Sequence, residues 1–254
     1  MHFIKSFDPE LPCGPQITCH LQRLARKVVY LMSAAYEHDN QEAIHDARRC
    51  LKVMVALIGL LRGATDRLHL RSLRMKCRKA LHCLGKLRDH QVIQQLLSKE
   101  FGVFSEIQTL SHWLHVRKTV RHLAENVRVT ARDLRTRHAR RGARDVLIRS
   151  WNKTAQLAEH ARASPDVNSL HTLRRHAIRL RIQGIAISEM GGLAMEQIDS
   201  LESLCSDLGA HHDLAMAMDH ADDEVISVMG ARSTILQRRA LERVRHLFSE
   251  LLHA

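Results

Sequence analysis

Apolar residues recur every three or four positions along most of the chain, which is the period of an amphipathic α-helix. Breaks in this pattern predict helices over residues 15–37, 40–62, 66–84, 88–100, 105–127, 133–161, 167–190, 194–208, 212–228 and 231–252. The candidate N-caps are Asp39 or Asn40 for the second helix and Asp166 or Asn168 for the seventh. The candidate helix stops are Gly63, Gly85, Gly191 and Gly209. The pattern therefore predicts an all-α protein.

Two short motifs occur twice, in the same order. His45-Asp-Ala-Arg recurs 126 residues later at His171, and Leu84-Gly-Lys-Leu-Arg-Asp recurs 124 residues later as Leu208-Gly-Ala-His-His-Asp. A matched offset indicates an internal duplication, and a unit of this length suits four helices with short connections. We therefore expect one domain over 1–254, built of two pseudo-symmetric antiparallel four-helix bundles over 13–127 and 128–254.

Each His-x-x-Arg helix carries a basic stripe opposite an apolar one. At about 100° per residue, His45, Arg48 and Lys52 share one face of the first helix. On the second helix, His171, Arg174 and Arg181 lie together, with Arg179 beside them. Neither helix has acids spaced for pairing with these cations. A solvated helix face is the alternative, but a bound polyanion would relieve the repulsion between the cations.

The predicted helix 66–84 adds a row of arginines. Arg67, Arg71, Arg74 and Arg78 fall within about 60° of arc, and Arg88 continues the row. Arginine donates two parallel hydrogen bonds to a phosphate group, and the net charge of +12 favours a polyanionic partner. The equivalent helix in the second half instead carries Glu196, Asp199, Glu202 and Asp207. We therefore expect the first half to bear more of the anion binding.

These motifs resemble the CHAD family, the conserved histidine α-helical domain. Its pattern H-x-x-R-x-x-x-[RK]-[RK]-x-R is matched by HDARRCLK and HTLRRHAIRLR, and its L-G-x-x-x-D element by LGKLRD and LGAHHD. The resemblance implies two four-helix bundles that bind inorganic polyphosphate in a basic groove between them. The anion ligands that it implies are His45, Arg48, Lys52, His171, Arg174, Arg179 and Arg181. From the arginine row, we expect Arg71, Arg74, Arg78 and Arg88 to extend the track. Val53, Val55 and Ile178 depart from the basic positions of the pattern.

Two other classes of partner stay open. The same cations could bind the phosphate backbone of a nucleic acid, although no aromatic residue lies within the basic motifs to stack on bases. The acidic segment 189–224 could instead recruit a basic protein, which would make the chain an interaction scaffold. We expect no cofactor, metal or catalytic residue, although Glu42 with His45, and His211, His212, Asp213 and His220, have spacings that a metal could use.

Cysteine usage and the apolar runs bear on location. None of the six cysteines forms a C-x-x-C pair, so we expect reduced, buried thiols. The longest apolar run, near residues 53–61, is too short to cross a bilayer. The expectation is a cytoplasmic protein without membrane contact, associated with polyphosphate granules or with enzymes of polyphosphate metabolism.

Overall fold

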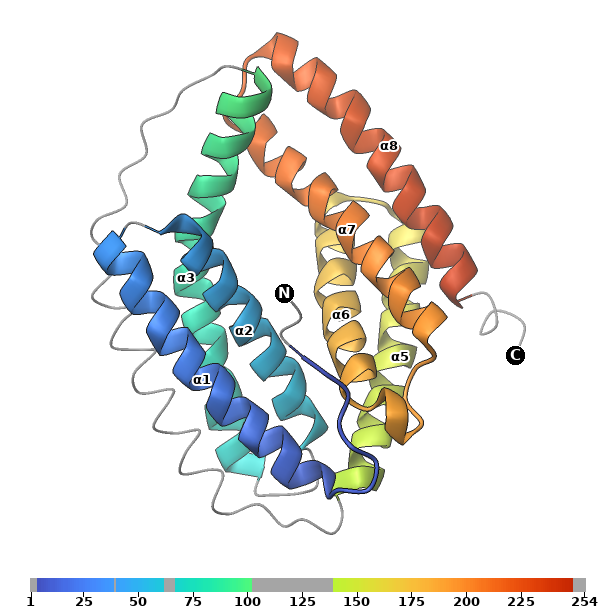
Figure 1. The fold of residues 1–254 in the computed structure, drawn as a ribbon. Helices are drawn as coiled ribbons and strands as arrows, with labels where there is room; N and C mark the ends of the chain where they lie inside the picture. Colours follow the sequence, from blue (N-terminus) through green and yellow to red (C-terminus); the bar gives the residue numbers. More distant parts are fainter. Residues whose placement is uncertain (1–3, 39, 62–66, 102–138, 249–254) are drawn as a thin grey trace. The chain divides into compact units, whose positions relative to one another are not determined.

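The computed structural model describes residues 4–38, 40–61, 67–101 and 139–248, and every regular element in these ranges is a helix (Figure 1). The elements are α1 (Cys13–His38), α2 (Gln41–Leu60), α3 (Arg67–Phe101), α5 (Ala139–Ala163), α6 (Val167–Ala186), the short 3₁₀ helix η2 (Ser188–Met190), α7 (Met195–Met218) and α8 (Asp223–Phe248). This confirms the all-α prediction. The duplication into two four-helix bundles, with bounds at 13–127 and 128–254, stays a prediction. No described helix is long and apolar enough to cross a membrane.

The helices bury the apolar stripes that their periodicity predicts. On α2 the buried stripe is Ala47, Leu51, Met54, Ile58 and Leu61; on α3 it is Leu70, Leu73, Cys77, Ala80 and Leu84; on α6 it includes Leu173, Ala177 and Leu180. The capping residues also agree. Asn40 accepts a hydrogen bond from the backbone nitrogen of Ala43 at 3.1 Å, and Asp166 accepts two at the start of α6. Both His-x-x-Arg helices are therefore fixed at their N-termini by the expected caps.

Two of the predicted helix stops are wrong. Gly85 and Gly209 lie inside α3 and α7, so each of these helices merges two predicted segments into one. Glycine weakens a helix but does not end it where the flanking turns are packed on both sides. The helix predicted to stop at Gly191 ends earlier, at Ala186, and Gly191 instead ends the short helix η2. Its φ of 78° is the left-handed conformation that glycine adopts without strain. Gly63 and the predicted helix 105–127 lie outside the described residues.

A second helix boundary that the sequence predicted wrongly lies near the C-terminus. We expected helices over 212–228 and 231–252, whereas α7 runs to Met218 and α8 begins at Asp223. Asp222 accepts a hydrogen bond from the backbone nitrogen of Val225 at 3.0 Å, which caps the new helix. The start of α8 is therefore set by the side chain of Asp222, a capping signal that the spacing of apolar residues does not contain.

The chain packs into two compact units that use segments distant in sequence. The first comprises residues 1–90, 107–147 and 182–192, and the second comprises 91–106, 148–181 and 193–254. In the first unit, the backbone nitrogen of Phe7 donates to the carbonyl of Ala186 at 3.0 Å, and Gln183 donates to that of Ala56 at 3.1 Å. These bonds fasten the N-terminal segment and the end of α6 onto the α1–α2 pair.

The second unit has a small core where α3 meets α7 and α8. Ile93 and Leu97 of α3 pack with Leu214, Ala217 and Met229. Trp151 of α5 contacts Phe248 of α8 edge-on, with ring centroids 5.0 Å apart. Because α3 continues past Gly85 instead of ending there as predicted, it contributes residues to both units.

All six cysteines are free thiols, but they are not all buried. Cys13, Cys50 and Cys77 are buried, Cys83 and Cys205 are half-buried, and Cys19 is exposed on α1, against the expectation. Burial raises the pKa of Cys50 to about 11 and that of Cys77 to about 12. These two thiols therefore stay protonated and unreactive at neutral pH.

Candidate anion-binding site

The basic stripe of α2 lies at the surface of the first unit. His45 is exposed, and Arg48 and Lys52 are half-buried, while the opposite side of the same helix is buried. The cap at Asn40 and the buried apolar stripe together fix which way these side chains face. The sequence-based assignment of the stripe to the outer face of the helix agrees with this placement.

Arg48 is held on α3 by three hydrogen bonds. Its Nη1 donates to the carbonyls of Leu84 and Gly85 at 3.3 and 2.9 Å and to Oδ1 of Asp89 at 3.2 Å. We expected the stripe cations to lack acidic partners, and for Arg48 this is wrong because the acid comes from a neighbouring helix. The His-x-x-Arg motif and the L-G-x-x-x-D element therefore meet in space.

The arginine row of α3 continues from this contact. Arg71 and Arg78 are exposed and Arg74 is half-buried. At about 100° per residue these three side chains lie within roughly 60° of Gly85, on the same face of α3. The α2 stripe and the α3 row therefore form one basic surface, which we call the α2–α3 surface. Arg88 lies in α3, but its side chain is outside the described residues, as is that of Arg67.

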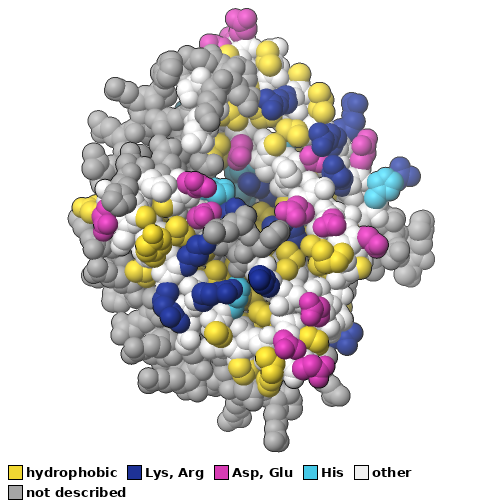
Figure 2. Space-filling model, viewed as in Figure 1, with side chains coloured by type: hydrophobic (Ala, Val, Ile, Leu, Met, Phe, Trp, Pro, Cys, Tyr) yellow, Lys and Arg dark blue, Asp and Glu magenta, His cyan; other side chains and the backbone are white. Residues whose placement is uncertain are grey.

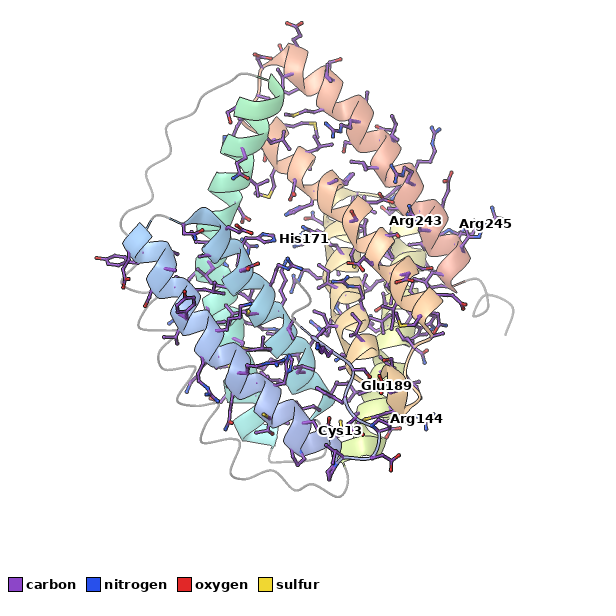
Figure 3. All side chains as sticks on the ribbon, in the orientation of Figure 1. Cys13, Arg144, His171, Glu189, Arg243 and Arg245 are labelled. Atoms are coloured by element: carbon purple, nitrogen blue, oxygen red, sulfur yellow. The ribbon has the colours of Figure 1, made fainter. Side chains whose placement is uncertain are left out.

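A matching arrangement occurs in the second unit, between α6 and α7. The ring of His171, which is labelled in Figure 3, lies 4.5 Å from that of His212, measured between centroids. Arg174 follows His171 by three residues on α6, and its guanidinium lies over Gly209, which precedes His212 by three residues on α7. The two helices therefore run antiparallel, and the arginine of the His-x-x-Arg motif again lies on the glycine of the L-G element.

Arg174 differs from Arg48 in its partners. It is half-buried, and within the described part of the chain it forms no ion pair and its Nε, which is buried, has no hydrogen-bond partner. The side chain is held by packing against Gly209, where a Cβ would lie 3.3 Å from Nη2. A cation placed in this way is suited to receive an anion. Arg179, on the same helix, is also half-buried.

Arg181 forms an ion pair with Glu202 of α7. This again corrects the expectation that the stripe lacks acidic partners. The repeat offsets of 126 and 124 residues place Val55 and Arg78 at the equivalent positions of the first half. Val55 is buried, and Arg78 is exposed. In the second half these two positions therefore form a neutral ion pair, whereas in the first half they carry one net positive charge.

One of the acids expected on the acidic segment is internal. Asp207 is buried in α7 and pairs with Arg239 at 3.2 Å and with Arg243 at 2.7 Å, both from α8. The basic residues that neutralise it lie more than thirty positions away, so the charge pattern along the chain could not reveal them. Glu196, Asp199 and Glu202 are exposed, in keeping with an acidic surface on α7.

The described residues offer little to a cation. No group of three His, Cys, Asp or Glu side chains among them is placed to hold a metal ion. Burial lowers the pKa of His211, which favours its neutral form inside α7. Figure 2 shows arginine and lysine side chains exposed together with histidine at the surface. The chemistry that the site supports is binding of an anion by guanidinium, ammonium and imidazole groups.

Three comparisons with known proteins bear on this site. The sequence model of the CHAD domain matches residues 19–222. A solved structure, PptA from Streptomyces chartreusis, is similar with a TM-score of 0.56 and 14% sequence identity over 96% of this chain and 100% of that one. At this identity the likeness shows the fold alone. No curated protein matches the chain.

Proposed function

Because the chain belongs to the CHAD domain family, we propose that it binds inorganic polyphosphate and catalyses no reaction on it. The family is known for polyphosphate binding, and two of the chain's own features fit this ligand. The net charge is +12, and the basic side chains gather on the faces of α2, α3 and α6 that carry the family motifs.

The observation that carries the proposal is the placement of Arg174. A half-buried guanidinium without an acidic partner in the described residues is costly, because its charge is partly removed from water and not compensated. A phosphate oxygen would supply the missing acceptor. On α2, Arg48 is presented in the same place of the repeat, beside Lys52 and the exposed His45.

We assign the ligands to two surfaces. On the α2–α3 surface they are His45, Arg48, Lys52, Arg71, Arg74, Arg78 and Arg88; on α6 they are His171, Arg174, Arg179 and Arg181. The arginines and Lys52 pair with phosphate charges, and the histidines donate hydrogen bonds to phosphate oxygens. We propose that each of these two surfaces binds polyphosphate.

Bare phosphate is favoured over nucleic acid by where the aromatic side chains lie. Tyr30 and Tyr36, the exposed large aromatic residues of the described part, are on α1, and none is on the faces of α2, α3 or α6 that carry the motifs. Proteins that bind single-stranded nucleic acids use aromatic side chains as platforms for bases. The assigned surfaces offer charge and hydrogen bonds but no such platform.

The proposal is tested by equilibrium binding of long-chain polyphosphate at one fixed salt concentration. We expect Arg174→Ala to weaken binding by about tenfold or more, which is the loss of a charge-assisted pair. Arg149→Ala is the matched control, since Arg149 is an exposed arginine of α5 outside the motifs. Equal, small losses in both variants would contradict the assignment.

The absence of catalysis has its own test. The protein is incubated with polyphosphate and Mg²⁺, and chain length and orthophosphate release are followed over time. We expect both to match a protein-free sample. Shortening of the chain that disappears in the His45→Ala or His171→Ala variant would overturn this part of the proposal.

A further inference from the structure

We propose that Gly209 is a positioning residue for anion binding: its missing side chain makes the seat that holds the guanidinium of Arg174 in place. This inference rests on the proposed function, because it names what prepares one of its assigned ligands. It goes further in identifying a backbone feature of α7, rather than a charged group, as a determinant of affinity.

The geometry at this contact leaves little room for a side chain at position 209. A Cβ at position 209 would lie 3.3 Å from Nη2 of Arg174 and 3.7 Å from both Cζ and Nε. The first distance is tighter than an ordinary van der Waals contact. The guanidinium therefore lies over position 209, and a methyl group there would require it to shift by a few tenths of an ångström.

In the described part of the chain, packing rather than a hydrogen bond to the buried Nε holds Arg174. In the part of the chain that the structure describes, the buried Nε of Arg174 has no acceptor. Arg48 is the informative contrast, since its Nη1 is fixed by two carbonyls and by Asp89, and a Cβ on Gly85 would lie 3.8 Å away. The arginine of the His-x-x-Arg motif is thus held by hydrogen bonds in α2 and by packing against a glycine in α6.

The stability of α7 does not explain a glycine at position 209, whereas the contact with Arg174 does. It lies in the interior of α7, where glycine is less favourable than alanine. It is also buried, so solvent exposure does not account for it. A held guanidinium loses less conformational freedom when a phosphate binds, which raises affinity without adding a contact.

The test compares polyphosphate affinity with stability in Gly209→Ala and Gly209→Leu. The added methyl group shifts Arg174 slightly, so we expect a loss of about threefold for alanine, and the leucine side chain occupies the seat, so we expect about tenfold. Gly230→Ala is the control, because this helical glycine of α8 has nothing within 4 Å of a built Cβ. We expect Gly209→Ala and Gly230→Ala to unfold no more easily than wild type.

A double-mutant cycle separates positioning from a general effect on the fold. In an Arg174→Ala background, Gly209→Ala and Gly209→Leu should cause no further loss, because the group that they displace is gone. An undiminished loss in that background would overturn the inference, as would wild-type affinity in the leucine variant. Wild-type protein that does not bind polyphosphate refutes the proposed function instead. A crystal structure of Gly209→Leu with Arg174 unmoved refutes the seat itself.

Discussion

Arg48 and Arg174 occupy the same position of the two His-x-x-Arg motifs, and their surroundings give them different electrostatics. Arg48 shares its charge with Asp89 and two carbonyls, whereas Arg174 has no acidic partner in the described residues. The side chain of Asp89 is 42% exposed, so water weakens the pair. On the proposed function, Asp89 competes with an incoming phosphate for Arg48, at a cost that a polyanion can overcome.

Removing this competitor should tighten binding. In Asp89→Asn the two carbonyls still hold Arg48, and the negative charge is gone, so we expect polyphosphate affinity to rise by about two- to fivefold, or ~0.5–1 kcal/mol. Asp145→Asn, at an exposed acid of α5, makes the same change of net charge and serves as control. Weaker binding in Asp89→Asn would show that Asp89 orients Arg48 rather than competing for it.

Asp166 makes the stability of the α6 start depend on pH. The pKa of its carboxyl is lowered by hydrogen bonds from the backbone nitrogens of Ser169 and Asn168, which favour the charged form. A lowered pKa in the folded state contributes stability above the ordinary carboxyl pKa, and this contribution is lost as pH falls through the lowered value.

The replacement Asp166→Asn tests this cap. Asparagine keeps a capping oxygen but cannot be protonated, so we expect the variant to be less stable than wild type at neutral pH and the difference to shrink in acid. Urea denaturation at neutral and acidic pH measures it. A difference between wild type and variant that stays constant with pH would contradict the role of the Asp166 charge.

At the scale of elements, the periodicity predicted the two basic stripes and their buried opposite faces. It could not predict which helices pack against them. Arg48 finds its acid 41 residues away on α3, and Arg181 finds Glu202 on α7, because both depend on the antiparallel pairing of whole helices. The stops predicted at Gly85 and Gly209 failed for the same reason. An arginine from the neighbouring helix lies against each of these glycines, and at Gly209 a Cβ would come closer to it than ordinary contact.

A third glycine makes room for a buried amide between α2 and the end of α6. A Cβ on Gly59 would lie 2.9 Å from Nε2 of Gln183, which donates to the carbonyl of Ala56. Gly59→Ala gains roughly 0.5–1 kcal/mol of helix propensity but disturbs this buried hydrogen bond, whose loss costs about 1–3 kcal/mol. We therefore expect a net loss of about 1 kcal/mol.

Thermal denaturation measures the effect of Gly59→Ala against Gly230→Ala. At position 230 a Cβ meets nothing within 4 Å, so alanine should stabilise the protein by roughly 0.5 kcal/mol. We expect the Tm values of the two variants to lie on opposite sides of that of wild type. If both rise together, Gln183 moves aside without cost and the packing argument is wrong.

For the whole molecule, composition and periodicity were enough to predict an all-α chain, and the repeated motifs were enough to identify its family. They did not predict that the compact units interleave segments from across the sequence, with α3 belonging to both. Such packing depends on contacts between residues far apart in the chain, which local patterns do not encode. The charge is also distributed differently from its order along the sequence, since Asp207 of the acidic segment is buried between arginines of α8.

The most direct test of the account is a competition titration at one fixed, physiological salt concentration. Labelled long-chain polyphosphate is displaced by short polyphosphate, single-stranded DNA, RNA and double-stranded DNA, with wild type and an Arg48→Ala/Arg174→Ala variant in parallel. Salt must be constant, since release of counterions drives binding of either kind of polyanion. We predict that polyphosphate competes far better than any nucleic acid and that the double variant loses most of its affinity. Equal competition by nucleic acid, or unchanged binding by the variant, would contradict the account.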